Sequence, residues 1–448
     1  MKKSLHLLLF LLCGVSSFSQ IISGPMLGST ELRTAKIWVE TKPNSNVSLW
    51  YWPKSAPNNV HKAFETTYKK YDFQVIHYDL VALEPGTVYE YELRVGKKIL
   101  PDQYKGTVTT SELWQWRKPA PDFSFLAGSC AYINDSLYDR PGEKYGTDNV
   151  IFQTMAKEKA EAMIWLGDAW YYREADLGSE YGMWYRASHD RQIPNMQKFL
   201  KSMKHYAIWD DHEYGPNNDG VSFIFKDITR EVFKSYFLNP SYGEYGKGIY
   251  TKVSLNDVDL FFLDNRTWRS SDYMNSKIDE KVNQDKIMLG EQQMTWLKSA
   301  LLNSNAPFKL IVIGSQVLNT SSSVDCFCEY EKEYNELLDF IEREKVRGIL
   351  FVTGDRHHSE IITKQRESTY PLYDITISPL TSGIGYVSPK ERENPNRVAN
   401  TLLESYNYGK FSISGEYNNR RLKVEFIDAQ GNSRVNWSIH QNDLRTPK

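Results

Sequence analysis

Short runs of alternating apolar and polar residues mark the N-terminal part of the chain. The clearest of these runs are at 36–40, 47–51 and 88–95. A period of two is typical of strands with one buried face, and turn-forming residues separate the runs. Closely spaced short strands of this kind predict a small all-β sandwich of the fibronectin or immunoglobulin type over residues 20–112.

After residue 121 the pattern changes to continuous apolar runs that alternate with amphipathic segments. The apolar runs predict buried strands at 123–127, 162–166, 205–209, 258–263, 309–313 and 349–353. The amphipathic segments predict helices at 150–160, 290–302 and 333–344. Strands that alternate with helices are typical of α/β layers with buried sheets. Strand periodicity returns at 409–440, and we assign residues 121–448 to one α/β domain.

The beginning of the chain has the pattern of a cleavable signal peptide over residues 1–19. Two lysines precede an apolar run at 7–12, and small residues precede a cleavage position at Gln20. The run is too short to span a bilayer. Cys13 follows a large leucine, which disfavours lipid attachment at this cysteine. We therefore expect an exported protein, periplasmic or secreted, without a transmembrane segment.

Composition adds few restrictions on function. With 448 residues the chain is too long for one compact core, so two domains are expected. A formal net charge of −2 creates no field that would draw nucleic acid or an anionic membrane, and we predict no specific nucleic-acid binding. The cysteines beyond the signal segment are Cys130, Cys326 and Cys328. The last two are separated by one residue, which predicts a surface loop with two thiols or a strained disulfide.

The candidate chemistry follows the predicted strands of the second domain. Five of these strands run directly into polar residues: Gly128-Ser129-Cys130, Gly167-Asp168-Ala169-Trp170-Tyr171, Asp210-Asp211-His212-Glu213, Asp264-Asn265-Arg266 and Gly354-Asp355-Arg356-His357-His358. In open α/β sheets, ligands bind outside the carboxyl ends of the strands. We therefore expect these side chains to meet at one site.

A metal centre explains this cluster better than turn chemistry does. A single Gly-Asp after a strand is common in turns, but several carboxylates packed together repel one another unless a cation is bound. A thiolate and a phenolate in one site favour Fe³⁺, and a second position rich in carboxylates suits Ca²⁺ or another divalent ion. Strand alternation places Asp210 and Asp211 on opposite faces, so we expect only one of them to bind the ion.

Several motifs, taken in order and spacing, resemble the alkaline phosphatase D family of metallophosphatases. They are Gly128-Ser129-Cys130, Gly167-Asp168-x-x-Tyr171, Trp209-Asp210-Asp211-His212-Glu213, Leu263-Asp264-x-Arg266, Leu289-Gly290-x-Gln292-Gln293-x-x-Trp296-Leu297 and Gly354-Asp355-x-His357. The resemblance spans the chain to about residue 385. It implies a two-sheet, calcineurin-like α/β sandwich preceded by a fibronectin-like domain.

The same resemblance implies a set of metal ligands. Iron would be held by Cys130, Asp168, Tyr171 and His357. Asp168 would bridge to calcium, which Asp211 and Asp355 would complete. Two catalytic roles are also implied: His212 would face the phosphate, and Arg266 would be a clamp for an anionic group. The start of the chain departs from the family, because it lacks the paired arginines of many exported members.

The leading functional hypothesis is an exported hydrolase that releases phosphate from small or polymeric phosphoesters with metal-activated water. A phosphodiesterase is the alternative, and the segment 172–203 is a candidate cap that would favour terminal phosphates. A metal-stabilised protein that binds glycan or cell wall without catalysis is the hypothesis from another class. For other side chains we expect structural roles or none. Tyr172 is a weaker candidate ligand than Tyr171, and His358 is expected to line the site or to form hydrogen bonds rather than to bind metal. We expect His189 and His205 to be structural, and Arg173 and Arg269 to be solvated charges near the cleft.

Overall fold

Two large sheets organise the protein in a computed structural model that describes residues 20–321 and 325–446. The predicted signal segment 1–19 lies outside these described residues. The larger sheet has the strand order β23 (Ser433–His440), β22 (Arg421–Asp428), β21 (Asn407–Ser414), β10 (Phe123–Gly128), β11 (Ala162–Leu166), β12 (Lys204–Ile208), β1 (Ile21–Thr30), β2 (Ala35–Thr41), β6 (Phe73–Leu80) and β5 (Phe64–Lys70). The smaller has the order β13 (Thr251–Leu255), β14 (Val258–Phe262), β17 (Phe308–Val312), β18 (Ile349–Thr353), β20 (Leu372–Thr376) and β19 (Glu360–Lys364).

The predicted apolar strands are confirmed to within two residues at their ends. Strands β10, β11 and β12 are parallel neighbours in the larger sheet, and β14, β17, β18 and β20 are parallel in the smaller one. Every residue of β11, β14, β17 and β18 is buried. Such strands read as continuous apolar runs because helices or a second sheet cover both faces. The predicted strands at the C-terminal end are also confirmed, as β21, β22 and β23.

The N-terminal region is all β and is joined to the rest of the protein through one sheet. A third sheet contains β4 (His61–Lys62), β3 (Val47–Pro53), β7 (Val88–Val95) and β8 (Lys98–Ile99), and β9 (Gly106–Thr109) pairs with β7. In β2, Ile37 and Val39 belong to a small core within this region, whereas Trp38 belongs to the main core. Strand β1 also pairs in parallel with β12. The larger sheet therefore crosses the boundary at which the sequence predicts two separate domains.

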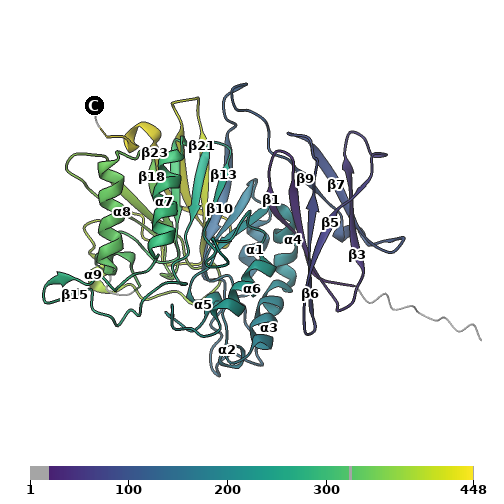
Figure 1. Cartoon of the computed structure of the whole chain (residues 1–448), viewed down its shortest axis with the longest axis horizontal. Helices are drawn as coiled ribbons and strands as arrows, with labels where there is room; N and C mark the ends of the chain where they lie inside the picture. The colour runs from purple at the N-terminus through teal and green to yellow at the C-terminus, as the bar shows by residue number, and fades with distance from the viewer. Residues whose placement is uncertain (1–19, 322–324, 447–448) are drawn as a thin grey trace, which may run out of the picture.

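The helices lie around these sheets. They are α1 (Val150–Met155), α2 (Glu174–Leu177), α3 (Glu180–Arg191), α4 (Pro194–Ser202), α5 (Asp211–Tyr214), α6 (Lys226–Tyr236), α7 (Glu291–Asn303), α8 (Glu331–Arg343) and α9 (Pro389–Arg392). Short 3-10 helices are η1 (Asp102–Tyr104), η2 (Phe327–Glu329) and η3 (Gln441–Leu444), and β15 (Lys277–Ile278) and β16 (Lys281–Val282) form a small ribbon. Figure 1 shows α7 and α8 beside the smaller sheet, and α1, α3, α4 and α6 beside the purple N-terminal strands.

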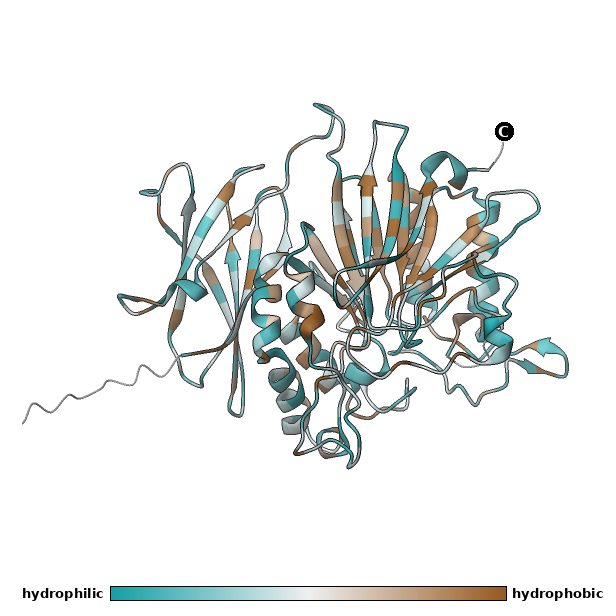
Figure 2. Cartoon of the chain, turned by 180° about the vertical axis from the view of Figure 1, so that it is seen from behind, coloured by the Kyte–Doolittle hydropathy of each residue, from teal (hydrophilic) through white to brown (hydrophobic). Residues whose placement is uncertain are grey.

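One hydrophobic core connects both large sheets. It includes Phe125 of β10, Ile164 of β11, Phe261 of β14, Ile311 of β17 and Phe351 of β18. Figure 2 shows the same distribution, with brown concentrated on the strands and teal on many of the surrounding helices and loops. Among the helices of the described residues, none combines the length and the apolar character that crossing a bilayer requires.

Candidate metal centre

The carboxyl ends of strands from both large sheets meet at one cluster of metal-capable side chains. Three overlapping groups of side chains could each hold a metal ion, and within each group the ligand atoms all lie within 4.8 Å of one another. The groups are Cys130 with Asp168 and His357, Asp168 with Asp211 and His212, and Asp210 with Asp211 and Asp355. Asp168 belongs to two groups and Asp211 to two, so the three form one continuous centre. The sequence correctly predicts that these strand ends meet.

Four of the candidate ligands have an unusual backbone conformation. The φ angles of Cys130, Asp168, Asp355 and His357 are +59°, +55°, +66° and +56°. These angles fall in the left-handed region, which non-glycine residues seldom adopt. Such strained residues are concentrated at functional sites. The sharp turns after β10, β11 and β18 therefore direct these side chains into the centre.

Two glycines leave room for the side chain of Asp210. A Cβ atom on Gly167 would lie 2.5 Å from the Asp210 Cβ atom, and one on Gly314 would lie 2.4 Å from the Asp210 Cγ atom. Gly167 also has a φ angle of +92°. Because Gly167 follows β11 and Gly314 follows β17, the close approach of the two sheets at this point requires both glycines.

Cys130 and His357 form the sulfur–imidazole side of the centre. The Cys130 Sγ atom lies 3.3 Å from Asp168 Oδ2, and the Ser378 hydroxyl donates to this sulfur at 3.0 Å. Burial opposes ionisation of the thiol, but His357 and the hydroxyl groups of Ser129 and Ser378 outweigh it and lower the pKa of Cys130 to about 7. A thiol with such a pKa is substantially ionised near neutral pH and is suited to bind a cation.

The ring of His357 is fixed by the loop that follows β20. Its Nδ1 atom lies 2.5 Å from the carbonyl oxygen of Gly383, which can only accept a hydrogen bond. Nδ1 therefore carries the proton, and Nε2 is left with the lone pair that a metal ligand needs. The Tyr145 hydroxyl lies 3.3 Å from the same Nδ1 atom. Burial disfavours the charged ring, but in the metal-free centre the neighbouring Cys130 raises the pKa of His357 to about 9, so a cation that binds Nε2 would displace the proton there.

Tyr171, rather than Tyr172, faces the candidate ligands. The Tyr171 hydroxyl donates to Asp168 Oδ2 at 3.1 Å, and its ring stacks on His212 with ring centres 4.0 Å apart. Tyr172 belongs to the hydrophobic core. Burial, followed by repulsion from Asp168 and Cys130, raises the pKa of Tyr171 well above its usual value. Only a strongly charged cation would offset these effects and favour the phenolate.

Both Asp210 and Asp211 point into the centre, which corrects the expectation from strand alternation. Strand β12 ends at Ile208 and α5 begins at Asp211, so the period of two no longer applies at these positions. Within the described residues, Asp210 Oδ2 and Asp211 Oδ1 are buried oxygens without a hydrogen-bond partner. Burial raises the pKa of Asp355 to about 8, and repulsion from Asp325 and Asp211 adds to this effect.

Arg266 lies beneath the carboxylates, where it is fully buried. Its Nε atom donates to Asp210 Oδ1 at 2.6 Å, and its Nη2 atom donates to Asp325 Oδ2 at 2.9 Å. A buried guanidinium held by two carboxylates is placed to neutralise and orient Asp210. The family resemblance implies an anion clamp at Arg266, whereas here its guanidinium binds two carboxylates.

The sequence-based view assigned no role to Glu213, although this residue lies in one of the quoted motifs. Its carboxylate accepts backbone N–H groups of Asp168 at 2.8 Å, Ala169 at 3.2 Å and Asp210 at 3.1 Å. Glu213 therefore ties the turn after β11 to the turn after β12. The signal was available in the sequence, because an acidic residue at the third position of a helix commonly caps its start.

The expectation that Arg173 and Arg269 are solvated is wrong, and the expectation that His205 is structural is confirmed. Arg173 and Arg269 are buried rather than solvated, with Arg173 paired to Asp139 and Arg269 to Asp325. The segment 172–203 forms α2, α3 and α4 and packs against β1, α1, α6 and β6, and its role as a cap stays a prediction. His205 is structural as predicted, because its buried ring bonds Trp165 and the Phe199 carbonyl.

The remaining histidines lie at different distances from the chemistry. His212 borders the centre, with 23% of its side chain exposed and its Nε2 atom 3.9 Å from Asp211 Oδ2. Burial lowers the pKa of His212. His358 is buried beside Glu360, with its Nε2 atom 3.4 Å from the carboxylate, and His189 bonds Asp190 at the surface of α3.

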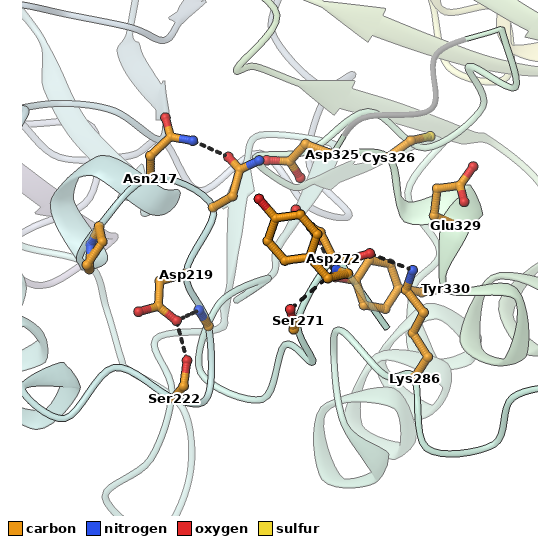
Figure 3. A pocket seen from close by; sticks show the side chains of 14 residues that line it. Asn217, Asp219, Ser222, Ser271, Asp272, Lys286, Asp325, Cys326, Glu329 and Tyr330 are labelled. Carbon is orange, nitrogen blue, oxygen red and sulfur yellow. Dashed lines mark hydrogen bonds between the residues drawn. The ribbon is translucent and has the colours of Figure 1, made fainter. Parts of the chain in front are cut away.

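A polar pocket of about 530 Å³ adjoins the centre (Figure 3). One wall carries Asn218, whose N–H donates to Asp211 Oδ2 at 2.9 Å. Another carries Asp325, which pairs with Arg266. Amide, hydroxyl, carboxylate and tyrosine side chains line the rest of the pocket, together with Lys286.

Two family models, a curated protein and a solved structure match this chain. The family model described as PhoD-like phosphatase matches residues 129–426, and the one described as Domain of unknown function (DUF7800) matches residues 18–112. Alkaline phosphatase D of Bacillus subtilis (strain 168) is 23% identical over 330 residues, which are 63% of this chain and 53% of that protein. The chain thus spans about half the length of this relative. The solved structure of PhoD has a TM-score of 0.74 at 16% identity, over 97% of this chain and 93% of that chain, and shares its fold.

Proposed function

This chain belongs to the PhoD-like phosphatase family, and we propose that it hydrolyses phosphoesters at a centre of two adjacent metal ions. The observation that carries the proposal is the overlap of the ligand groups at Asp168, which would let one carboxylate serve both ions. The family match supports the reaction class. The arrangement of thiol, imidazole, phenol and carboxylates supports its dependence on metal.

The side chains fit metal ions by two independent criteria. Buried carboxylate oxygens on Asp210 and Asp211 have no hydrogen-bond partner in the described part of the chain, and such oxygens are destabilising unless a cation is bound. The donors also differ across the centre. Cys130 and His357 offer sulfur and nitrogen on one side, whereas Asp210, Asp211 and Asp355 offer only oxygen on the other.

We assign Fe³⁺ to the first side and Ca²⁺ to the second. Cys130, Asp168, Tyr171 and His357 would hold the iron, and Asp168, Asp211 and Asp355 would hold the calcium, with Asp210 adjacent. Ions bound there supply Lewis acidity for the phosphoryl oxygens and lower the pKa of water. Another divalent ion would satisfy the all-oxygen side equally well, since its donors are only carboxylates.

The surrounding side chains of the chain have distinct tasks in this proposal. His212 is partly exposed at the border of the centre, so its ring can donate a hydrogen bond to the phosphate and hold a proton near the leaving oxygen. Arg266 orients Asp210 from below instead of touching the substrate. The adjoining polar pocket would receive the group esterified to the phosphate.

The central experiment compares Asp168→Asn with a matched buried carboxylate outside the centre. Asp374→Asn is suitable, because Asp374 is equally buried but accepts the N–H groups of Val317 and Leu318 at 2.6 and 2.9 Å. We expect Asp168→Asn to lose bound metal and phosphate release together, and Asp374→Asn to keep both in its folded fraction. Full metal content and turnover in Asp168→Asn would refute the proposal.

The substrate class and the destination of the protein need separate measurements. Parallel assays with nitrophenyl phosphate and bis-nitrophenyl phosphate will show whether monoesters or diesters are preferred; we propose a monoesterase, with a phosphodiesterase as the alternative. Absence of phosphate release from a diverse ester panel by metal-loaded protein would favour a binding protein without catalysis. We also propose export, which N-terminal sequencing tests: a mature protein that begins at Gln20 is expected.

A further inference from the structure

The loop between β17 and α8 carries two cysteines whose sulfur atoms lie directly against each other. Cys326 and Cys328 are both thiols, and their Sγ atoms are 2.7 Å apart. A disulfide bond has a length of about 2.0 Å, so a shift of less than about 1 Å would bring the sulfurs to bonding distance. We propose that Cys326 and Cys328 are a reversible oxidation site, at which an external disulfide of low molecular weight converts the two thiols into one intramolecular disulfide.

The local backbone explains why the two sulfurs meet. Cys326 is extended and forms a bridge with Gln316, and η2 begins at Phe327. Phe327 points into the main core, where it is fully buried. Cys328 lies within η2, and both sulfurs face the segment that follows β17: the Cys326 Sγ atom is 3.7 Å from the Val317 carbonyl oxygen, and the Cys328 Sγ atom is 3.5 Å from the Asn319 carbonyl oxygen. The change from extended backbone to a 3-10 turn therefore places the two cysteines side by side against this segment.

The two thiols differ in accessibility, which sets the order of the chemical steps. Cys326 is fully buried, whereas Cys328 is half-buried. Burial, together with the neighbouring Cys328, raises the pKa of Cys326 well above its usual value and keeps it as a thiol. Cys328 is therefore the sulfur that attacks, and Cys326 is the sulfur that resolves.

The reaction is an ordinary thiol–disulfide exchange. Cys328 loses its proton to solvent and its sulfur attacks one sulfur of the external disulfide, which releases one small thiolate and leaves a mixed disulfide. The Cys326 sulfur then displaces the second small thiolate, and the Cys326 proton passes to it. The two protein thiols lose two electrons and the external disulfide gains them, so one disulfide and two small thiols result.

The position of the pair gives the oxidation a structural consequence. Cys326 lies on the wall of the polar pocket directly after Asp325, as Figure 3 shows. Asp325 in turn accepts hydrogen bonds from Arg266 at 2.9 Å and Arg269 at 2.6 Å. A disulfide here would restrain the chain segment that holds Arg266 beneath Asp210.

Peptide mapping can test the proposal on the purified full chain. Native protein is equilibrated with oxidised and reduced glutathione, quenched with acid, alkylated after unfolding, and digested with trypsin. Both cysteines lie in the tryptic fragment 310–332. We expect this fragment to lose two hydrogen atoms and both alkylation sites on oxidation, and to regain them with reductant. A fragment that stays fully alkylated, or that carries glutathione as the stable product, overturns the proposal.

Two comparisons test whether the fold, and not only the presence of two cysteines close in sequence, favours the disulfide. The native protein should form the disulfide at a glutathione ratio about tenfold less oxidising than the same protein in urea, because the fold holds the sulfurs together. An equal or more oxidising requirement in the native state contradicts the inference. Cys328→Ser should abolish the mass loss, whereas Cys130→Ser should leave it unchanged; loss of the disulfide in Cys130→Ser would show that Cys130 is a partner and refute the assignment.

Discussion

Replacement of Arg266 by methionine tests whether this residue supports the centre from below. Arg266 is fully buried and forms hydrogen-bonded ion pairs with Asp210 at 2.6 Å and Asp325 at 2.9 Å. Removal of one partner from a buried ion pair costs about 3–5 kcal/mol, because the other charge remains buried. Asp325 keeps Arg269 at 2.6 Å, so most of this cost falls on Asp210. We expect Arg266→Met to lower the free energy of unfolding by about 3–5 kcal/mol.

The chain provides a matched control in Arg186 of α3. This arginine is also fully buried, and it pairs with Asp176 at 2.8 Å, Asp135 at 3.3 Å and Asp190 at 3.4 Å. These carboxylates are outside the three candidate ligand groups. Arg186→Met should therefore lose a similar free energy of unfolding without any direct effect on the centre.

Urea unfolding followed by tryptophan fluorescence, with chelator and with saturating Ca²⁺, separates the two variants. A bound cation can replace Arg266 as the positive partner of Asp210, so the deficit of Arg266→Met should shrink by about 1.4 kcal/mol or more with Ca²⁺, which corresponds to about tenfold tighter binding. The deficit of Arg186→Met should stay constant. A deficit of Arg266→Met below about 1 kcal/mol, or one that Ca²⁺ leaves unchanged, would refute the supporting role.

Three further predictions concern other parts of the molecule. Glu213→Gln should weaken metal binding in a titration by about 10–100-fold, because Glu213 holds the backbone of Asp168. The control is Glu333→Gln, which alters a carboxylate that accepts three N–H groups at the start of α7 and should leave metal binding unchanged. Burial lowers the pKa of His205 to about 3, so the unfolded state alone takes up this proton as pH falls below about 6.5. Its contribution to stability should drop by about 1.4 kcal/mol between pH 7.5 and 5.5 in urea unfolding, and His205→Gln should lose this part of the slope. Tyr171→Phe should remove the phenolate-to-iron absorption band of Fe³⁺-loaded protein; an unchanged spectrum would exclude Tyr171 as a ligand.

The strand ends were predictable because their physics is local. Apolar runs such as 162–166 and 349–353 can only be buried strands at that length, and the carboxyl ends of parallel strands share one edge of a sheet. Cys130, Asp168 and His357 accordingly lie together as expected. Convergence of this kind needs no knowledge of side-chain partners that are distant in the sequence.

The errors arose where distant segments decide the outcome. The orientation of Asp210 depends on where β12 ends and on space left by Gly314, which periodicity within one strand cannot reveal. Burial of Arg269 depends on Asp325, a residue of the loop after β17 that lies outside the polar runs quoted at the predicted strand ends. Charged residues are exposed by default, so a buried arginine is predictable only when its partner is known.

The larger sheet makes the candidate metal centre depend on the N-terminal region. Strand β12, which leads directly to Asp210 and Asp211, has β1 as one of its two neighbours. Met26 of β1 and Trp38 of β2 belong to the main hydrophobic core. A chain shortened to start after residue 112 would leave β12 as an exposed edge strand, and unpaired edges of this kind template aggregation. The N-terminal strands therefore cover the edge of the larger sheet beside the candidate centre, and we expect neither part to fold stably without the other.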